Sequence, residues 1–191
     1  MKAASGRIRI IGGHLRNSRL NVPDLPGLRP TPERVRETLF NWLGERIRGA
    51  RCLDLFAGSG ALGLEALSRG AAQVSFIERD VAAVRELRAR LSEWGSTSGS
   101  VERADALAFL ENPPQPFDIV FLDPPFGAGL LEPAAQRLSE RGWLRPPALI
   151  YVESAAREAL PPLPPGFEPL KAKRAGEVGY HLFGYSCATE V

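Results

Sequence analysis

The sequence predicts an α/β fold built on a doubly wound, mostly parallel sheet of seven strands. Short apolar runs alternate along the chain with segments whose apolar residues recur at helical spacing, which is typical of repeated strand–helix–strand units. Four of the expected strands lead into a carboxylate, namely Asp54, Glu78, Asp105 and Asp123. Because ligands of such sheets bind at the carboxyl ends of the strands, we expect these four side chains to line one crevice.

Composition narrows the class of protein. The chain has 191 residues, 44% of them hydrophobic and 24% charged, which suits one soluble globular domain. It contains neither an apolar run long enough to span a membrane nor an N-terminal signal sequence. Two cysteines, Cys52 and Cys187, and two histidines, His14 and His181, favour neither a disulfide framework nor a metal site. We therefore expect a cytoplasmic, metal-free protein, and nothing indicates more than a monomer.

The first 28 residues are predicted to form a small extension ahead of a single domain over residues 29–191. Residues 7–11 and 15–20 are typical of two short strands joined at Gly12-Gly13. Proline and glycine then mark a linker over residues 21–30.

The extension is basic. Arg7, Arg9, Arg16 and Arg19 all precede the first acidic residue, Asp24, although the net charge of the whole chain is only +2. A basic N-terminal segment on a nearly neutral protein suits binding to the phosphate backbone of a nucleic acid. A solvated, arginine-rich surface without a partner would give the same composition.

The remaining elements follow from caps and periodicity. Thr31-Pro32-Glu33 predicts a helix start, with a threonine cap, and an apolar stripe continues to Ile47 before Gly49. Further helices are expected from about Ala61 to Gly70, from Val81 to Trp94, at 106–110 and at 130–141. Strands are expected at 52–54, 73–77, just before Asp105, at 117–122, at 148–152, and in a C-terminal antiparallel hairpin of 167–174 and 178–185.

A glycine-rich turn follows the first strand of the main sheet. Gly58 and Gly60 allow the backbone to approach a ligand closely, and the helix beginning near Ala61 directs free N–H groups at the same place. The sequence therefore predicts a nucleotide-like cofactor here. The glycines have a purely structural alternative, namely a tight strand-to-helix turn.

Two cofactors fit this turn. Gly58, Gly60 and Gly63, with Glu78 downstream, match the nicotinamide-dinucleotide pattern. However, Asp54 stands at the entrance of the loop, four residues before the first glycine, where it would repel a pyrophosphate. S-adenosylmethionine has an amino-acid end and a ribose but no phosphate, so the residues favour it.

Asp123-Pro124-Pro125-Phe126 is the most specific short motif. Its prolines have no amide hydrogen, so Asp123 and the Pro124 carbonyl form adjacent hydrogen-bond acceptors that suit a planar amino group. Accepting those hydrogens would favour a tetrahedral nitrogen with an available lone pair, and Phe126 would stack on the base, which is worth about 1–3 kcal/mol. A strand-terminating turn with a capping aspartate is the structural alternative.

Together these segments resemble the class I S-adenosylmethionine-dependent amino-methyltransferases. More narrowly, the chain resembles the bacterial 16S ribosomal RNA guanine-N2 methyltransferase family, which implies a Rossmann-like methyltransferase sheet and methylation of one guanine during small-subunit assembly. The segments that carry the narrower resemblance are Ile10–Gly13, Arg29–Thr31, Arg34–Asn41 and Phe56–Gly63.

The resemblance implies a role for each site residue. It assigns Asp54, Phe56, Gly58 and Gly60 to the methionine half of S-adenosylmethionine, Glu78 to the ribose, and Asp105 with Ala106 to the adenine. It assigns Asp123, Pro124 and Phe126 to the target base, and Arg7, Arg9, Arg16, Arg19 and Arg29 to the RNA. Arg29 and Thr31 would also help to close the site. Phe126 stands where many relatives have tyrosine, so stacking is retained and a hydroxyl is not.

Other functions use the same residues. A DNA adenine-N6 methyltransferase shares the Asp-Pro-Pro-Phe chemistry but usually has a large target-recognition domain. A protein glutamine methyltransferase also fits the motif, although the basic extension would then have no purpose. A non-catalytic RNA-binding assembly factor would have no need for intact Asp54, Glu78 and Asp123.

Overall fold

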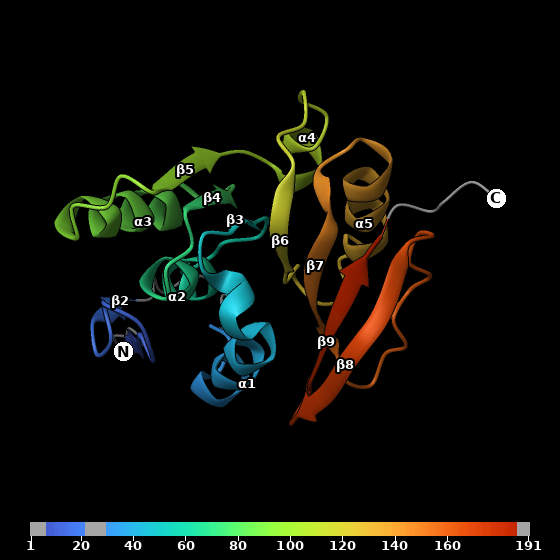
Figure 1. Cartoon of the computed structure of the whole chain (residues 1–191), viewed down its shortest axis with the longest axis horizontal. Coiled ribbons are helices and arrows are strands. Elements are labelled where there is room, and N and C mark those ends of the chain that lie inside the picture. The colour runs from blue at the N-terminus through green and yellow to red at the C-terminus, as the bar shows by residue number, and fades with distance from the viewer. Residues whose placement is uncertain (1–6, 22–29, 187–191) are drawn as a thin grey trace, which may run out of the picture.

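The computed structural model describes residues 7–21 and 30–186 (Figure 1). Its helices are α1 (Glu33–Leu43), α2 (Ala61–Ser68), α3 (Val81–Glu93), α4 (Ala106–Phe109) and α5 (Leu131–Glu140), with a short 3-10 helix at Gly44–Ile47. Its strands are β1 (Arg7–Arg9), β2 (Arg19–Asn21), β3 (Arg51–Asp54), β4 (Gln73–Glu78), β5 (Gly99–Arg103), β6 (Phe117–Leu122), β7 (Leu144–Ala155), β8 (Phe167–Ala175) and β9 (Val178–Tyr185).

The predicted doubly wound sheet is confirmed. Seven strands lie in the order β5-β4-β3-β6-β7-β9-β8, with β5 and β8 at the two edges (Figure 1). The first five of these are parallel, whereas β9 runs antiparallel to both of its neighbours. The chain leaves β3 toward β4 on one side and later returns to β6 on the other, so the order reverses between β3 and β6. A crevice opens at such a reversal, at the carboxyl ends of the strands.

Helices cover both faces of the sheet. Along β6, Ile119 and Phe121 join one buried cluster and Val120 and Leu122 join the other, because successive side chains of a strand point to opposite faces. The first cluster contains apolar residues of α1, α2 and α3, and the second contains those of α4 and α5. The result is a three-layer α/β domain. None of the helices in the described part of the chain is long and apolar enough to cross a membrane.

The N-terminal hairpin forms, but its turn differs from the prediction. β1 pairs antiparallel with β2 through Ile8 and Leu20, and residues 10–18 form the connection instead of a turn at Gly12-Gly13. The reason is that this connection, besides the hydrogen bonds within it, also binds α2. The last turn of a helix has free carbonyls, and the backbone N–H of His14 donates to the carbonyl of Ser68 at 2.9 Å.

Boundaries differ elsewhere for local reasons. α1 ends at Leu43 because Gly44 has φ of 53°, and the apolar stripe continues to Ile47 in the 3-10 helix. β5 begins at Gly99, earlier than the short strand expected just before Asp105, because it pairs with β4 from there on. β7 is longer than predicted at both ends, since Leu144 pairs with Phe117 and Ala155 with Val178.

Candidate active site

A cavity of about 960 Å³ opens at the carboxyl ends of the parallel strands. It brings together predicted residues from β3, β4, β6 and the segments that follow them. The predicted residues in its lining are Asp54, Phe56, Gly58, Glu78, Asp105, Ala106, Asp123, Pro124 and Phe126. The expected convergence of the four carboxylates is therefore confirmed.

Asp54 fixes the start of the glycine-rich turn. Its carboxylate is 2% exposed, and Oδ2 accepts the backbone N–H of Gly63 at 3.0 Å. Burial raises the pKa of Asp54 to about 7, although that hydrogen bond acts in the opposite direction. A cation bound in the cavity would favour the ionised form, because an opposite charge stabilises a carboxylate.

Gly60 supports the turn without lining the cavity. It caps α2 with φ of 76°, a left-handed conformation that side chains disfavour. A Cβ at this position would lie 2.2 Å from Cδ2 of Leu87, so the close packing of α3 also requires glycine. Its contribution to a ligand site is thus the shape of the loop.

Glu78 and Asp105 each bind backbone N–H groups. Oε2 of Glu78 accepts from Gly58 and Oε1 accepts from Asp80, both at 2.7 Å, so this carboxylate holds the glycine-rich turn against β4. Oδ1 of Asp105 caps α4 by accepting from Leu107 and Ala108 at 3.0 and 3.1 Å. A carboxylate oxygen has further lone pairs, so both side chains retain acceptor capacity toward the cavity.

Asp123 follows β6 and meets Thr31 from the other end of the sequence. The Thr31 hydroxyl donates to Oδ2 of Asp123 at 3.5 Å. The predicted threonine cap of α1 is wrong, because Pro32 occupies the capping position and no side chain caps the helix. Thr31 is instead 6% exposed and lines the cavity. The expected contribution of Thr31 to the site is supported by this contact.

Sequence reasoning did not include Glu153, which follows Val152 in β7. It is 3% exposed, lines the cavity, and its Oε1 accepts the Tyr151 hydroxyl at 2.8 Å. Burial raises the pKa of Glu153, and burial together with the negative charge of Glu153 raises the pKa of Asp123. The signal was present in the sequence, since Glu153 directly follows the apolar run of the strand expected at 148–152, as the four predicted carboxylates follow theirs.

Pro124 and Phe126 form the wall beside Asp123. Pro124 is buried, whereas Phe126 is 47% exposed at the cavity despite its large apolar ring. Neither Pro124 nor Pro125 has an N–H group, so the backbone here offers acceptors only. A planar ligand with an amino group matches this wall of carbonyl, carboxylate and aromatic ring.

The predicted RNA-binding arginines lie on the hairpin surface. Arg7, Arg9, Arg16 and Arg19 are exposed, and Ile8 and Leu20 face the core. Arg9 also forms an ion pair with Glu33. Arg29 lies outside the described residues.

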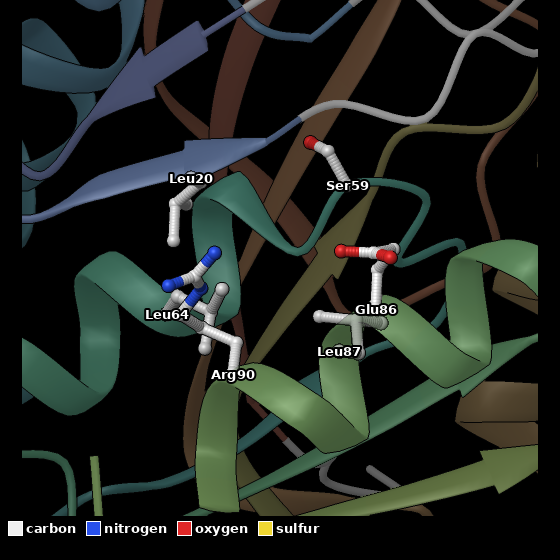
Figure 2. A pocket seen from close by; sticks show the side chains of 6 residues that line it. All are labelled: Leu20, Ser59, Leu64, Glu86, Leu87 and Arg90. Carbon is white, nitrogen blue, oxygen red and sulfur yellow. The ribbon is translucent and has the colours of Figure 1, made fainter. Parts of the chain in front are cut away.

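A second hollow lies behind the glycine-rich turn. Figure 2 shows Leu20 of β2, Leu64 of α2, and Leu87 and Arg90 of α3 around it, with Ser59 and Glu86. Its volume is about 10 Å³, which is near the minimum for one water molecule. It marks where β2 packs on the two helices and has no room for a ligand.

The charge of the large cavity bears on the choice of cofactor. Among the described residues its lining contains eight carboxylate side chains and two arginines, Arg79 and Arg157. A pyrophosphate would face predominantly negative groups, whereas a ligand with an ammonium and a sulfonium group would be attracted. The cavity therefore favours S-adenosylmethionine over a dinucleotide.

Comparisons with known proteins agree with this site. The family profile described as conserved hypothetical protein 95 matches residues 8–184. The chain is 51% identical over 181 residues to ribosomal RNA small subunit methyltransferase D of Escherichia coli strain K12, covering 95% of this chain and 91% of that protein. The chain belongs to the family of ribosomal RNA small subunit methyltransferase D. The expected family is thereby confirmed.

Solved structures support the same assignment. A putative methyltransferase from Escherichia coli superposes with a TM-score of 0.89 at 48% identity, covering 95% of this chain and 99% of that one. An RNA methyltransferase from Salinibacter ruber, in complex with S-adenosyl-L-homocysteine, has a TM-score of 0.64 at 17% identity, covering 85% and 96% of the two chains. The second likeness shows the fold, which is the Rossmann-like methyltransferase fold predicted from the sequence.

Proposed function

We propose that this protein transfers a methyl group from S-adenosylmethionine to the exocyclic N2 of one guanine in 16S rRNA. The substrate would be the RNA itself or a small-subunit assembly particle. The observation that carries the proposal is the pair of acceptors at Asp123 and Pro124, beside Phe126 and next to an acidic cofactor cavity. Membership in the family of ribosomal RNA small subunit methyltransferase D supports the choice of RNA.

The cofactor site fits S-adenosylmethionine in its charge and in the hydrogen-bond acceptors that line it. When bound, this cofactor supplies an electrophilic methyl group. Asp54 would hold its ammonium group, Glu78 the ribose hydroxyls, and Asp105 with the backbone at Ala106 the adenine. Phe56 and Gly58 would line the methionine half. Each of these residues lines the cavity, and their acceptor oxygens match the donors of the cofactor.

The target nitrogen needs activation because its lone pair is delocalised into the purine ring. Asp123 and the Pro124 carbonyl would accept its two hydrogens, which favours a tetrahedral nitrogen with the lone pair directed at the methyl group. The same two acceptors stabilise the positive charge that develops on nitrogen. Phe126 would hold the purine ring in place by stacking on its face. Orientation and electrostatics thus replace a strong base.

RNA binding is assigned to the hairpin. Arg7, Arg9, Arg16 and Arg19 are exposed, and the hairpin is docked on α2, whose first turn follows the glycine-rich loop. Arginines bind phosphate through several donors at once. The Arg29 assignment is retained as part of this proposal.

The proposal is tested by methyl transfer from radiolabelled S-adenosylmethionine to three substrates. These are naked 16S RNA, 30S particles from cells that lack the gene, and duplex DNA. Digestion and chromatography identify the labelled nucleoside. Label in N2-methylguanosine from either ribosomal substrate supports the proposal, and the better substrate indicates the stage of assembly. Label in N6-methyladenine of DNA would contradict it, and label in none of the three would indicate a protein substrate or an inactive enzyme.

A further inference from the structure

Glu153 lies directly beside the proposed target site. In the parallel pair β6–β7, Phe121 is opposite Tyr151 and Leu122 is opposite Val152. The residues that follow these pairs are Asp123 and Glu153, so their side chains lie next to each other at the carboxyl ends of the parallel strands. Both line the large cavity.

Glu153 retains acceptor capacity toward the cavity. Its Oε1 accepts the Tyr151 hydroxyl at 2.8 Å, which fixes the side chain, and hydrogen bonding by Thr31 also acts to lower its pKa, but a carboxylate has further lone pairs. No described cation lies within ion-pair distance of it. A carboxylate that is 3% exposed, lines the cavity and has no cation beside it is available to a ligand group that has a hydrogen to donate.

The chemistry of guanine supplies that group. On its Watson–Crick edge the 2-amino group and the N1–H are adjacent donors. Adenine has an amino group next to a bare N1, which is an acceptor. If Asp123 and the Pro124 carbonyl hold the amino group, the neighbouring position N1 faces the next acceptor along the sheet edge. A carboxylate at this point accepts the N1–H of guanine and repels the N1 lone pair of adenine.

We propose that Glu153 determines specificity for guanine by accepting the N1–H of the target base, while Asp123 and Pro124 hold the 2-amino group. This inference rests on the proposed function and assigns the source of its base selectivity. An N–H donor in this position also stabilises the ionised carboxylate, which offsets the effect of burial. The Tyr151 hydroxyl acts as a positioning group, since it restrains Glu153 and lines no part of the cavity.

2-Aminopurine separates recognition of N1 from reaction at the amino group. It keeps the 2-amino group of guanine but has a bare N1 and lacks O6, so the change of preference between the wild-type protein and the variant is what isolates N1. Once the target guanine is mapped with the wild-type protein, 2-aminopurine is placed at that position of the RNA by ligation. kcat/KM is then measured for both bases with the wild-type protein and with Glu153→Gln, whose amide is able to donate to N1. Asp118→Asn, at the opposite end of β6, is the matched control.

We expect the wild-type protein and Asp118→Asn to prefer guanine by about tenfold or more, the effect of leaving a buried acceptor unpaired. In Glu153→Gln this preference should disappear or reverse, with unchanged affinity for S-adenosylmethionine. A uniform loss on both bases in Glu153→Gln would overturn the inference, because a structural role lowers both. Equal rates of the wild-type protein on both bases would overturn it without any variant. If the protein methylates guanine at N2 but does not prefer guanine over 2-aminopurine, the proposed function stands and the inference on Glu153 fails. If no N2-methylguanosine forms, both the proposed function and this inference are contradicted.

Discussion

Nη1 of Arg36 lies 3.2 Å from Oε2 of Glu65, and both side chains are at most 1% exposed. The same guanidinium donates to the backbone carbonyls of Arg9, at 3.0 Å, and of Thr31, at 3.2 Å. One buried pair therefore connects the basic hairpin, the helix α2 and the start of α1. Because Thr31 also reaches Asp123, the position of the hairpin is linked to the geometry of the target site.

Arg36→Met is expected to lower the free energy of unfolding by about 3–5 kcal/mol, since it leaves part of a buried carboxylate and two carbonyls unpaired. Thermal or urea denaturation measures this effect. Arg48→Met is the control, because Arg48 pairs with Glu45 on the surface, with side chains 73% and 83% exposed. Such a pair contributes about 1 kcal/mol or less. Equal losses in the two variants would contradict the importance of the buried pair.

Gly63→Ala tests the packing of α2 against the cofactor site. A Cβ at Gly63 would lie 2.3 Å from Cε1 of Phe76 and 3.0 Å from Oδ2 of Asp54. Alanine favours a helix by about 1 kcal/mol over glycine, but overpacking costs about 1–3 kcal/mol. We expect a net loss of stability and weaker binding of S-adenosylmethionine, measured by denaturation and calorimetry.

Gly184→Ala in β9 is the matched control for that substitution. Its Cβ would lie 3.4 Å from Cδ1 of Leu170, which belongs to a half-exposed side chain. We expect stability and cofactor affinity to remain close to those of the wild-type protein. If Gly63→Ala behaves in the same way, the contact between α2 and Asp54 does not shape the cofactor site.

The pKa of Asp54 predicts a pH dependence. Burial raises this pKa to about 7, above the value of about 3.9 in an unfolded chain. Between these values the folded protein holds a proton that the unfolded chain has released. The contribution of Asp54 to folding stability is therefore full below about pH 4, is lost as the pH rises to about 7, and is constant above it.

Cofactor binding should change in the opposite direction. The ammonium group of S-adenosylmethionine binds the ionised carboxylate, so affinity should rise by up to about tenfold per pH unit below pH 7 and then level. Titration calorimetry between pH 5.5 and 7.5 measures this, below the pKa of about 7.7–8.0 that is usual for an α-amino group. Asp54→Asn should bind weakly with little dependence on pH, and a wild-type affinity that is constant over the range would contradict the assignment.

The hairpin arginines should set the salt dependence of RNA binding. Arg7→Gln with Arg9→Gln is expected to reduce the slope of log K against log salt by about 0.7 to 0.9 for each phosphate that the double variant no longer binds. Arg145→Gln is the control. Arg145 lies near the amino end of β7, whereas the cavity lies at the carboxyl ends of the strands. An unchanged slope in the double variant would exclude these two residues from phosphate binding.

The strands and their carboxylates were predictable because the signal is local. Apolar runs ending at Asp54, Glu78 and Asp123 identify parallel strands, and the parallel arrangement itself places their ends together. The topology therefore follows from the alternation of elements. Glu153 obeys the same rule, and its place beside Asp123 becomes clear only from the register of β6 with β7.

Contacts between distant segments were not predictable. Thr31 has the local signature of a helix cap, yet its hydroxyl contacts Asp123, 92 residues away. Gly12-Gly13 has the local signature of a tight turn, yet the backbone around it binds Glu65 and Ser68 of α2. In both cases a tertiary partner satisfies the polar groups that a local motif would otherwise have used. Such partners leave no periodic signal in a sequence.

The central claim is that Asp123 holds the amino group that accepts the methyl group. Single-turnover methyl transfer to the preferred ribosomal substrate, with the product nucleoside identified, tests it in Asp123→Ala beside the wild-type protein. We expect transfer to N2 of guanine to fall by about 10²–10³ or more, the usual loss when one preorganised electrostatic contact is removed. Affinity for S-adenosylmethionine should stay within about threefold. Transfer at a rate near that of the wild-type protein, in a folded variant that binds the cofactor, would contradict the account.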